Sequence, residues 1–311
     1  MKKPFAQALV CVAFLLASCG GDDGSPPPPT GGGGATPTPS PAPSYTTFDA
    51  LAVDTTFDTS CSGSYRSTPS DESIELTDLG FGKGLAVSYR ATNQSWTVAG
   101  TGFSYEFTPA DRDTRYDSVY FLTPPSGELI TFGLATETTQ YAREMVLVST
   151  SAGAPYQLVS CVLGMPTQAS DEPTETTTYA VDSLVGNVYI NGKSYDLSAS
   201  TAQFSYDPAT RGVTLDVTLA GKQTNSVDGN PPPGAAVTLG KFQSAPGSGI
   251  TAPSFAGALV SSVLPNLEGK FGGAIFGPRG IEAAMVIKFA GINVHGSEYS
   301  GNATLIVKKA N

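Results

Sequence analysis

The chain has 311 residues and a formal net charge of −10, with 27 Asp and Glu residues against 17 Lys and Arg residues. An acidic chain without a Lys/Arg cluster argues against nucleic acid or anionic lipid as a partner. Gly, Pro, Ser and Thr are abundant, long helix-forming stretches are missing, and Thr, Val, Tyr and Phe are spread throughout, which favours β-strands.

The N-terminus has the pattern of an export signal. Two lysines precede an apolar run over residues 8–16, which is too short to span a bilayer as a lasting helix. The sequence LASC at 16–19 resembles a bacterial lipobox, which predicts a signal peptide at 1–18 and acyl chains on Cys19. The alternative is an ordinary signal peptide with an incidental cysteine. Gly20 stands where an inner-membrane retention signal usually has Asp, so we expect delivery to the outer membrane.

The remaining cysteines agree with export. Cys11 lies in the signal segment and Cys19 is the lipid site, which leaves Cys61 and Cys161. Two cysteines in an exported chain predict one disulfide bond. Neither belongs to a CxxC pair, so a redox or metal role is not expected.

Composition then divides the chain into parts. Residues 19–44 are Gly- and Pro-rich and predict a disordered tether. Residues 45–165 contain short runs such as SWTVAG and EMVLVS and predict a β-rich domain, followed by a polar linker at 166–178. Residues 179–311 hold eight strand candidates, at 179–190, 195–206, 213–220, 236–243, 254–260, 267–276, 282–289 and 302–309. The predicted fold class is all-β, with an eight-stranded antiparallel β-barrel after the N-terminal domain.

The stretch FGGAIFGPRGIEAAMVIKF, at 271–289, crowds glycines into two strand candidates and the turn between them. Glycines in strands occur where a sheet kinks or a neighbouring group comes close, so this stretch is typical of a barrel corner. With Leu, Val, Phe and Met facing inward, we expect a filled barrel interior and a binding site in the loops.

Residues 267–289 resemble the closing strands of the barrels of bacterial transferrin-binding protein B. The positions that match the family's motif are Gly269, Phe271, Phe276, Gly277, Pro278 and Glu282. The resemblance implies a handle-like N-terminal domain and a lipid-anchored surface protein. Ala283-Ala284 replaces the family's usual glycine pair, and the chain has room for one lobe where the full protein has two. It therefore resembles the smaller single-lobe lipoproteins, whose ligands differ.

Candidates for chemistry are few. The only histidine, His295, is a haem or metal ligand, a catalytic base, or a plain loop residue; we expect the loop residue. The acidic run at 111–117 resembles calcium-loop spacing but lacks the central Gly and the closing Glu, and its arginines compete for the carboxylates. Arg279, at the turn tip, either contacts a partner or is an ordinary polar turn residue. We predict no catalytic residue, no metal site and no cofactor.

The sequence therefore predicts a lipid-anchored outer-membrane protein, facing the cell surface, that binds a ligand and is not an enzyme. The resemblance suggests an iron-, haem- or metalloprotein-related ligand that is passed to an outer-membrane transporter. The expected partners are an unknown protein or small molecule, that transporter, and the membrane through the lipid, with no nucleic acid. The alternatives are a structural or adhesion lipoprotein of the cell envelope and, third, a secreted hydrolase.

Overall fold

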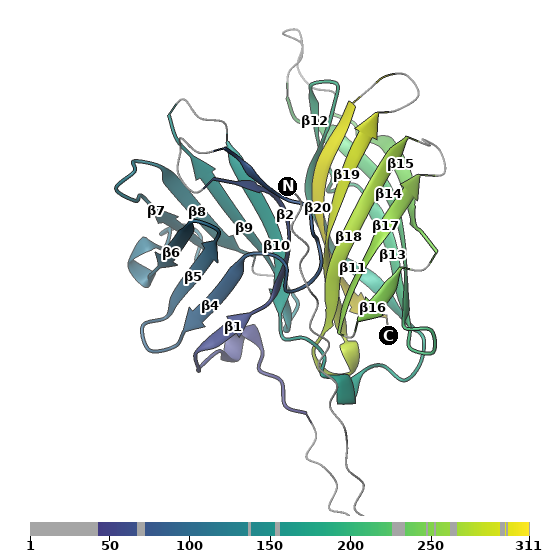
Figure 1. Ribbon diagram of the computed structural model, residues 1–311, viewed down its shortest axis with the longest axis horizontal. Coiled ribbons are helices and arrows are strands. Elements are labelled where there is room, and N and C mark those ends of the chain that lie inside the picture. The colour runs from purple at the N-terminus through teal and green to yellow at the C-terminus, as the bar shows by residue number, and fades with distance from the viewer. Residues whose placement is uncertain are drawn as a thin grey trace, which may run out of the picture. The chain divides into compact units, whose positions relative to one another are not determined.

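Three antiparallel sheets contain the strands of the chain in the computed structural model (Figure 1). The structure describes residues 43–66, 72–135, 138–152, 156–225, 234–246, 248–251, 253–261, 266–292, 296 and 298–310. The helical elements of these residues are four short 3-10 helices, η1 (Phe48–Ala50), η2 (Pro109–Asp111), η3 (Ala169–Asp171) and η4 (Pro278–Gly280). No helix in this described part is long and apolar enough to cross a membrane.

The N-terminal strands form two sheets around one core. The four-stranded sheet has the order β1 (Thr55–Phe57), β4 (Ala86–Arg90), β5 (Ser95–Gly100) and β6 (Phe103–Phe107). The six-stranded sheet has the order β3 (Ile74–Leu76), β2 (Thr59–Tyr65), β10 (Gln157–Gly164), β9 (Ala142–Thr150), β8 (Leu129–Leu134) and β7 (Val119–Leu122). Both sheets contribute to a core in which the Trp96 ring lies 5.8 Å from Phe57 and 6.0 Å from Phe132, measured between centroids.

The predicted disulfide bond lies inside this core and is confirmed. Cys61 on β2 and Cys161 on β10 are directly opposite each other in the antiparallel register and are bonded. Both are fully buried. The bond therefore joins the beginning of the N-terminal sheets to their end.

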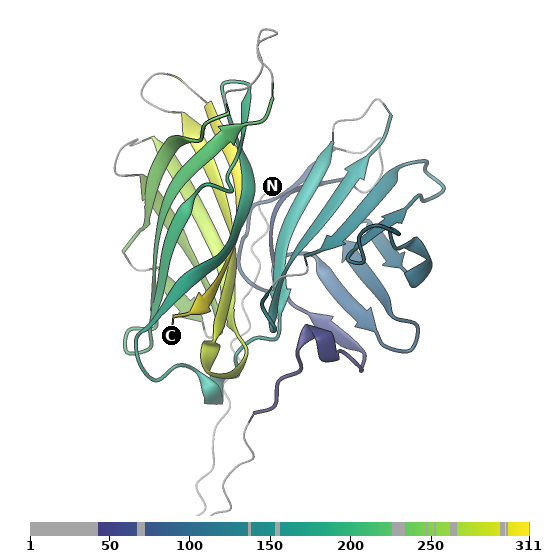
Figure 2. The ribbon, with the colours of Figure 1, turned by 180° about the vertical axis from the view of Figure 1, so that it is seen from behind.

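The C-terminal strands close into an eight-stranded ring, which confirms the predicted all-β fold with an antiparallel barrel. The ring order is β11 (Thr177–Ile190), β13 (Thr201–Asp207), β14 (Gly212–Gln223), β15 (Val237–Ser244), β17 (Ser254–Ser261), β18 (Leu267–Phe276), β19 (Glu282–Ile292) and β20 (Glu298–Lys309). β20 pairs back with β11 and so closes the ring. Two short strands, β12 (Lys193–Asp196) and β16 (Gly249–Thr251), pair beside it, and Figure 2 shows the barrel from behind.

One predicted strand is divided in two. The candidate at 195–206 is interrupted between β12 and β13, where the Asp196 carboxylate accepts the Ser198 backbone N–H at 2.9 Å. A short acceptor that bonds two residues ahead favours a turn over a continuing strand. Residues 166–178, predicted as the linker, carry η3 and the first residues of β11, and the domain boundaries themselves stay a prediction.

Side chains fill the barrel interior, as the inward-facing pattern predicted. A buried cluster includes a row of rings in which Phe204 lies 5.2 Å from Phe255 and Phe255 lies 6.2 Å from Phe271. A second pair, Phe242 and Phe289, lies 4.9 Å apart. An eight-stranded barrel is just wide enough for such packing, so recognition is left to the ends and the outer wall.

Candidate functional site

The motif residues on β18 lie where the barrel packs on the six-stranded sheet. Phe276 is buried in a small cluster between the two, with its ring centroid 5.5 Å from that of Phe81. Gly272 touches the loop between β3 and β4 directly, because a Cβ there would lie 1.9 Å from the carbonyl oxygen of Leu79. Phe271 instead points into the barrel core, and Gly269 pairs with the buried Leu259 on the neighbouring strand.

The turn after β18 continues this packing. Gly277 has φ +71°, and a Cβ on it would lie 2.5 Å from the ring of Tyr141, so only glycine fits without strain. Its N–H donates to the carbonyl of Met165 at 2.9 Å. Pro278 follows as the first residue of η4.

Glu282 makes three hydrogen bonds between the barrel and the segment that leads into β9. Its buried carboxylate accepts the backbone N–H groups of Gln140 at 2.7 Å, Tyr141 at 2.8 Å and Ala142 at 2.9 Å. Hydrogen bonds to an ionised acceptor are roughly twice as strong as neutral ones. Phe276, Gly277 and Glu282 therefore hold the two parts of the fold together, whereas Gly269 and Phe271 belong to the barrel itself.

Two sequence-predicted residues, Cys19 and His295, lie outside the described residues. In the acidic run at 111–117, the carboxylates of Asp111 and Asp113 have partners within the chain. Asp111 caps η2 through the backbone and hydroxyl of Thr108, at 2.8 and 2.7 Å. Asp113 is held by the guanidinium and backbone of Arg115, whose hydrogen bonds lower the pKa of the Asp113 carboxyl. No group of three or more His, Cys, Asp or Glu residues suited to a metal ion occurs among the described residues.

Antiparallel pairing puts the turns of the barrel at two ends. We call one the tether end, because residues 43–45 lie there: the Tyr45 hydroxyl accepts the N–H of Gln168 at 2.9 Å, beside η3 and η4. The other, the distal end, holds the connections after β11, β14, β17 and β19 (Figure 1). The two ends differ in the side chains that they expose.

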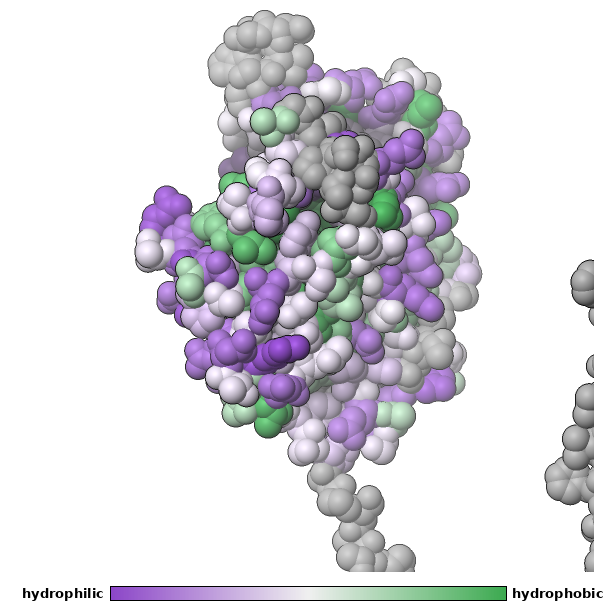
Figure 3. All heavy atoms as spheres, turned by 60° about the vertical axis from the view of Figure 1, so that its left-hand side comes forward, coloured by the Kyte–Doolittle hydropathy of each residue, from purple (hydrophilic) through white to green (hydrophobic). Residues whose placement is uncertain are grey.

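Large apolar side chains gather near the distal end. Cross-strand register aligns one outward-facing row over five neighbouring strands: Val260, Glu268, Ala290, Ser300 and Tyr189. We call this row, together with Ile292 and Tyr156, the distal rim. Its large apolar members are about half exposed, Tyr156 at 59%, Tyr189 at 53%, Ile292 at 52% and Val260 at 49%. Figure 3, which brings the N-terminal sheets forward, shows hydrophobic side chains in several separate places among polar ones on that face.

Tyr156 and Tyr189 come from different parts of the fold and lie close enough to interact. Desolvation of the Tyr156 hydroxyl, and then the neighbouring Tyr189, raise the pKa of Tyr156 above its usual value of 10.0. The Tyr156 hydroxyl is therefore neutral at physiological pH. Half-exposed tyrosines combine large contact area with a hydrogen-bonding tip, which is typical of residues that anchor protein interfaces.

A cavity of about 440 Å³ adjoins the rim on the outer wall of β18 and β19. Lys270 and Lys288, which line it, are directly opposite each other in the register. Like charges in that position repel each other, but Glu75 pairs with Lys288 and offsets one of them. Lys270 has no ion pair among the described residues, so it adds a free cation beside the apolar rim.

Comparison with known proteins finds no matching family model, and no curated protein matches in sequence. Among solved structures, the chain is similar to a double mutant of transferrin binding protein B from Haemophilus parasuis Hp5, with TM-score 0.46 and 13% identity over 81% of this chain and 44% of that one. It is also similar to intact Ap-TbpB with its N and C lobes (TM-score 0.44, 12% identity, 82% and 46% covered). For isotype 1 of the protein from serogroup B Neisseria meningitidis the TM-score is 0.41, with 14% identity and 83% and 44% covered. The chain thus spans less than half of these proteins.

Proposed function

We propose that this chain is a lipid-anchored binding protein of the outer membrane that captures a ligand at its distal rim and catalyses no reaction. The observation that carries the proposal is the gathering of half-exposed Tyr156, Tyr189, Val260 and Ile292 near the end opposite the tether end. Half-exposed aromatic side chains of this kind are typical anchors of protein interfaces. A protein anchored through its N-terminal tether would present this end to an incoming partner.

The remaining parts of the proposal come from the sequence. The lipobox ending at Cys19 supports a lipid anchor, and residues 19–44 support a spacer between the lipid and the fold. Transfer to an outer-membrane transporter, and an iron-, haem- or metalloprotein-related ligand, follow from the family resemblance of residues 267–289. Transferrin is not proposed, because the single-lobe lipoproteins that the sequence resembles bind other ligands.

The alternative is a structural or adhesion lipoprotein that presents a barrel without a specific ligand. The two differ in one measurable property, a saturable ligand. A hydrolase, the third possibility, would need His295, the only histidine in the chain. Turnover that disappears in His295→Ala would favour it.

The first experiment locates the fold. Intact cells are treated with an added protease, the region from residue 45 to 311 is followed by immunoblot, and a periplasmic protein is the control. Loss from intact cells supports surface presentation. Digestion only after lysis contradicts capture at the cell surface.

The second experiment tests the rim. The chain, purified without its lipid through Cys19→Ser, is titrated with haem and with serum metalloproteins by surface plasmon resonance. We expect one ligand to saturate and to lose affinity in Tyr156→Ser with Tyr189→Ser. Tyr116→Ser is the matched control, because Tyr116 is 60% exposed and lies outside the rim. Equal losses in both proteins would contradict a rim site.

A further inference from the structure

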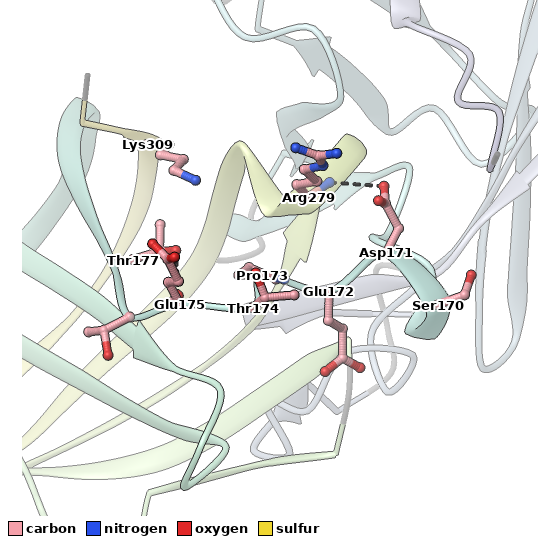
Figure 4. A pocket seen from close by; sticks show the side chains of 10 residues that line it. Ser170, Asp171, Glu172, Pro173, Thr174, Glu175, Thr177, Arg279 and Lys309 are labelled. Carbon is pink, nitrogen blue, oxygen red and sulfur yellow. Dashed lines mark hydrogen bonds between the residues drawn. The ribbon is translucent and has the colours of Figure 1, made fainter.

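The tether end contains a second, polar cavity of about 570 Å³ (Figure 4). It lies between residues 170–177, the turn at η4 and the end of β20. Hydroxyl side chains line part of its wall, and it has five charged residues: Asp171, Glu172, Glu175, Arg279 and Lys309. Its chemistry is therefore unlike that of the apolar rim.

Two of these charges are already satisfied. Asp171 accepts the backbone N–H of Arg279 at 3.0 Å, the contact drawn in Figure 4. Glu172 pairs with Arg211 at 3.2 Å and accepts the hydroxyl of Tyr206 at 3.3 Å, and its carboxylate points away from the cations in that view. Neither carboxylate is thus the partner of the two cationic side chains.

The other three charges remain free. The side chains of Glu175, Arg279 and Lys309 make no ion pair or hydrogen bond with any described residue. With Asp171 and Glu172, they give the cavity two cationic and three anionic side chains, of which Glu175, Arg279 and Lys309 have no partner among the described residues.

The backbone at Arg279 has the left-handed conformation of a turn. Arg279 has φ +52° and lies next to Gly280. Gln94, Asn191 and Arg211 adopt the same conformation, so it is a property of the turn. Glycine adopts this conformation freely, so it can replace Arg279 without backbone strain.

We propose that this cavity binds a zwitterionic phosphate ester of the phosphoethanolamine class. The Arg279 guanidinium and the Lys309 ammonium bind the phosphate, and the Glu175 carboxylate binds the ligand's ammonium group. Guanidinium matches phosphate oxygens in a two-pronged geometry, and both contacts are charge-assisted. The ligand is either a lipid headgroup or a free ester, and the binding is independent of the role proposed for the rim.

The test uses the full mature chain with Cys19→Ser, titrated with phosphoethanolamine, inorganic phosphate and ethanolamine while amide chemical shifts are recorded. We expect phosphoethanolamine to bind at least about tenfold more tightly than either fragment, because it makes both sets of charged contacts. Arg279→Gly should abolish this binding without unfolding the protein, since glycine suits φ +52°. Lys193→Gln, at the distal end, removes the same charge and should have no effect.

Glu175→Gln separates the two halves of the site. It should weaken phosphoethanolamine binding while leaving inorganic phosphate binding unchanged or stronger. Flotation with phosphatidylethanolamine vesicles, against phosphatidylcholine vesicles, then identifies the source: co-flotation supports a lipid headgroup, and solution binding alone supports a free ester. Phosphoethanolamine binding no tighter than that of phosphate, or binding unchanged in Arg279→Gly, overturns the proposal.

Discussion

Replacing Glu282 by Gln should make the barrel and the N-terminal sheets unfold in two separate transitions. The Glu282 carboxylate is 3% exposed and accepts three backbone N–H groups from the segment that leads into β9. The amide keeps the size of the side chain but loses its charge and turns an N–H₂ group toward those donors. Charge-assisted bonds contribute more than neutral ones and an unsatisfied buried donor costs about 1–3 kcal/mol, so we expect a loss of about 2–3 kcal/mol.

The position of Trp96 makes this loss easy to follow. It is the only tryptophan and is buried in the N-terminal core, so its fluorescence reports unfolding of those sheets, while far-ultraviolet circular dichroism reports all strands. The two signals should coincide in the wild-type protein. In Glu282→Gln the midpoint should fall by about 5–10 °C, at about 2–4 °C per kcal/mol, and the two transitions should separate.

The matched control is Glu268→Gln on the adjacent strand. Glu268 is exposed on the outer wall and makes no hydrogen bond or ion pair with a described residue, so its replacement should change stability by less than about 0.5 kcal/mol. If Glu282→Gln also stays within that margin, or if the two signals still coincide, Glu282 does not couple the two parts and the reasoning is wrong.

Three further outcomes follow from named contacts. Reducing the bond between Cys61 and Cys161, which are 100 residues apart in sequence, should lower stability by up to about 4–5 kcal/mol, seen as a lower urea midpoint. Gly277→Ala should cost clearly more than Gly127→Ala in thermal unfolding; both have positive φ, but only at Gly277 would the new methyl group meet a ring. The lowered pKa of Asp113 means that its stabilising contribution is present above its ordinary value of 3.8 and is lost on acidification, so Asp113→Asn should flatten the stability profile between about pH 5 and pH 2.

The sequence predicts most of this fold because its strands are regular. In β14, Val213, Leu215 and Val217 face the core, while Thr214 and Asp216 between them do not. The sequence shows this alternation directly. The disulfide followed from a count, since only Cys61 and Cys161 remained after the signal and lipid sites were removed. The strands follow from a local pattern, and the disulfide follows because two remaining cysteines allow only one pairing.

The binding surface was hidden for a physical reason. On β11 the inward residues Leu184 and Val188 alternate with the outward Val185 and Tyr189. Both faces of the strand are therefore apolar, and the alternation of side chains along it does not show which face is buried. Tyr156 lies just before β10, far away in sequence, and only the packing of the six-stranded sheet on the barrel brings it near Tyr189. No pattern within one strand carries that information.

The role of the glycines explains why part of the barrel wall is not available for recognition. Barrel closure and the close approach of a neighbouring group were the expected reasons for the glycines at 269–277, and Gly272 has the second: it lies against the carbonyl of Leu79, in the loop between β3 and β4. A close contact between two backbones leaves no room for a larger side chain. The residues of the barrel wall that pack on the N-terminal part therefore cannot be substituted freely. The filled interior is fixed as well, because a change of even one methylene is felt in a close-packed core. Exposed side chains near the two ends that make no such contact can change without altering the strand register. An apolar rim at one end and a polar cavity at the other can therefore be shaped independently on one scaffold.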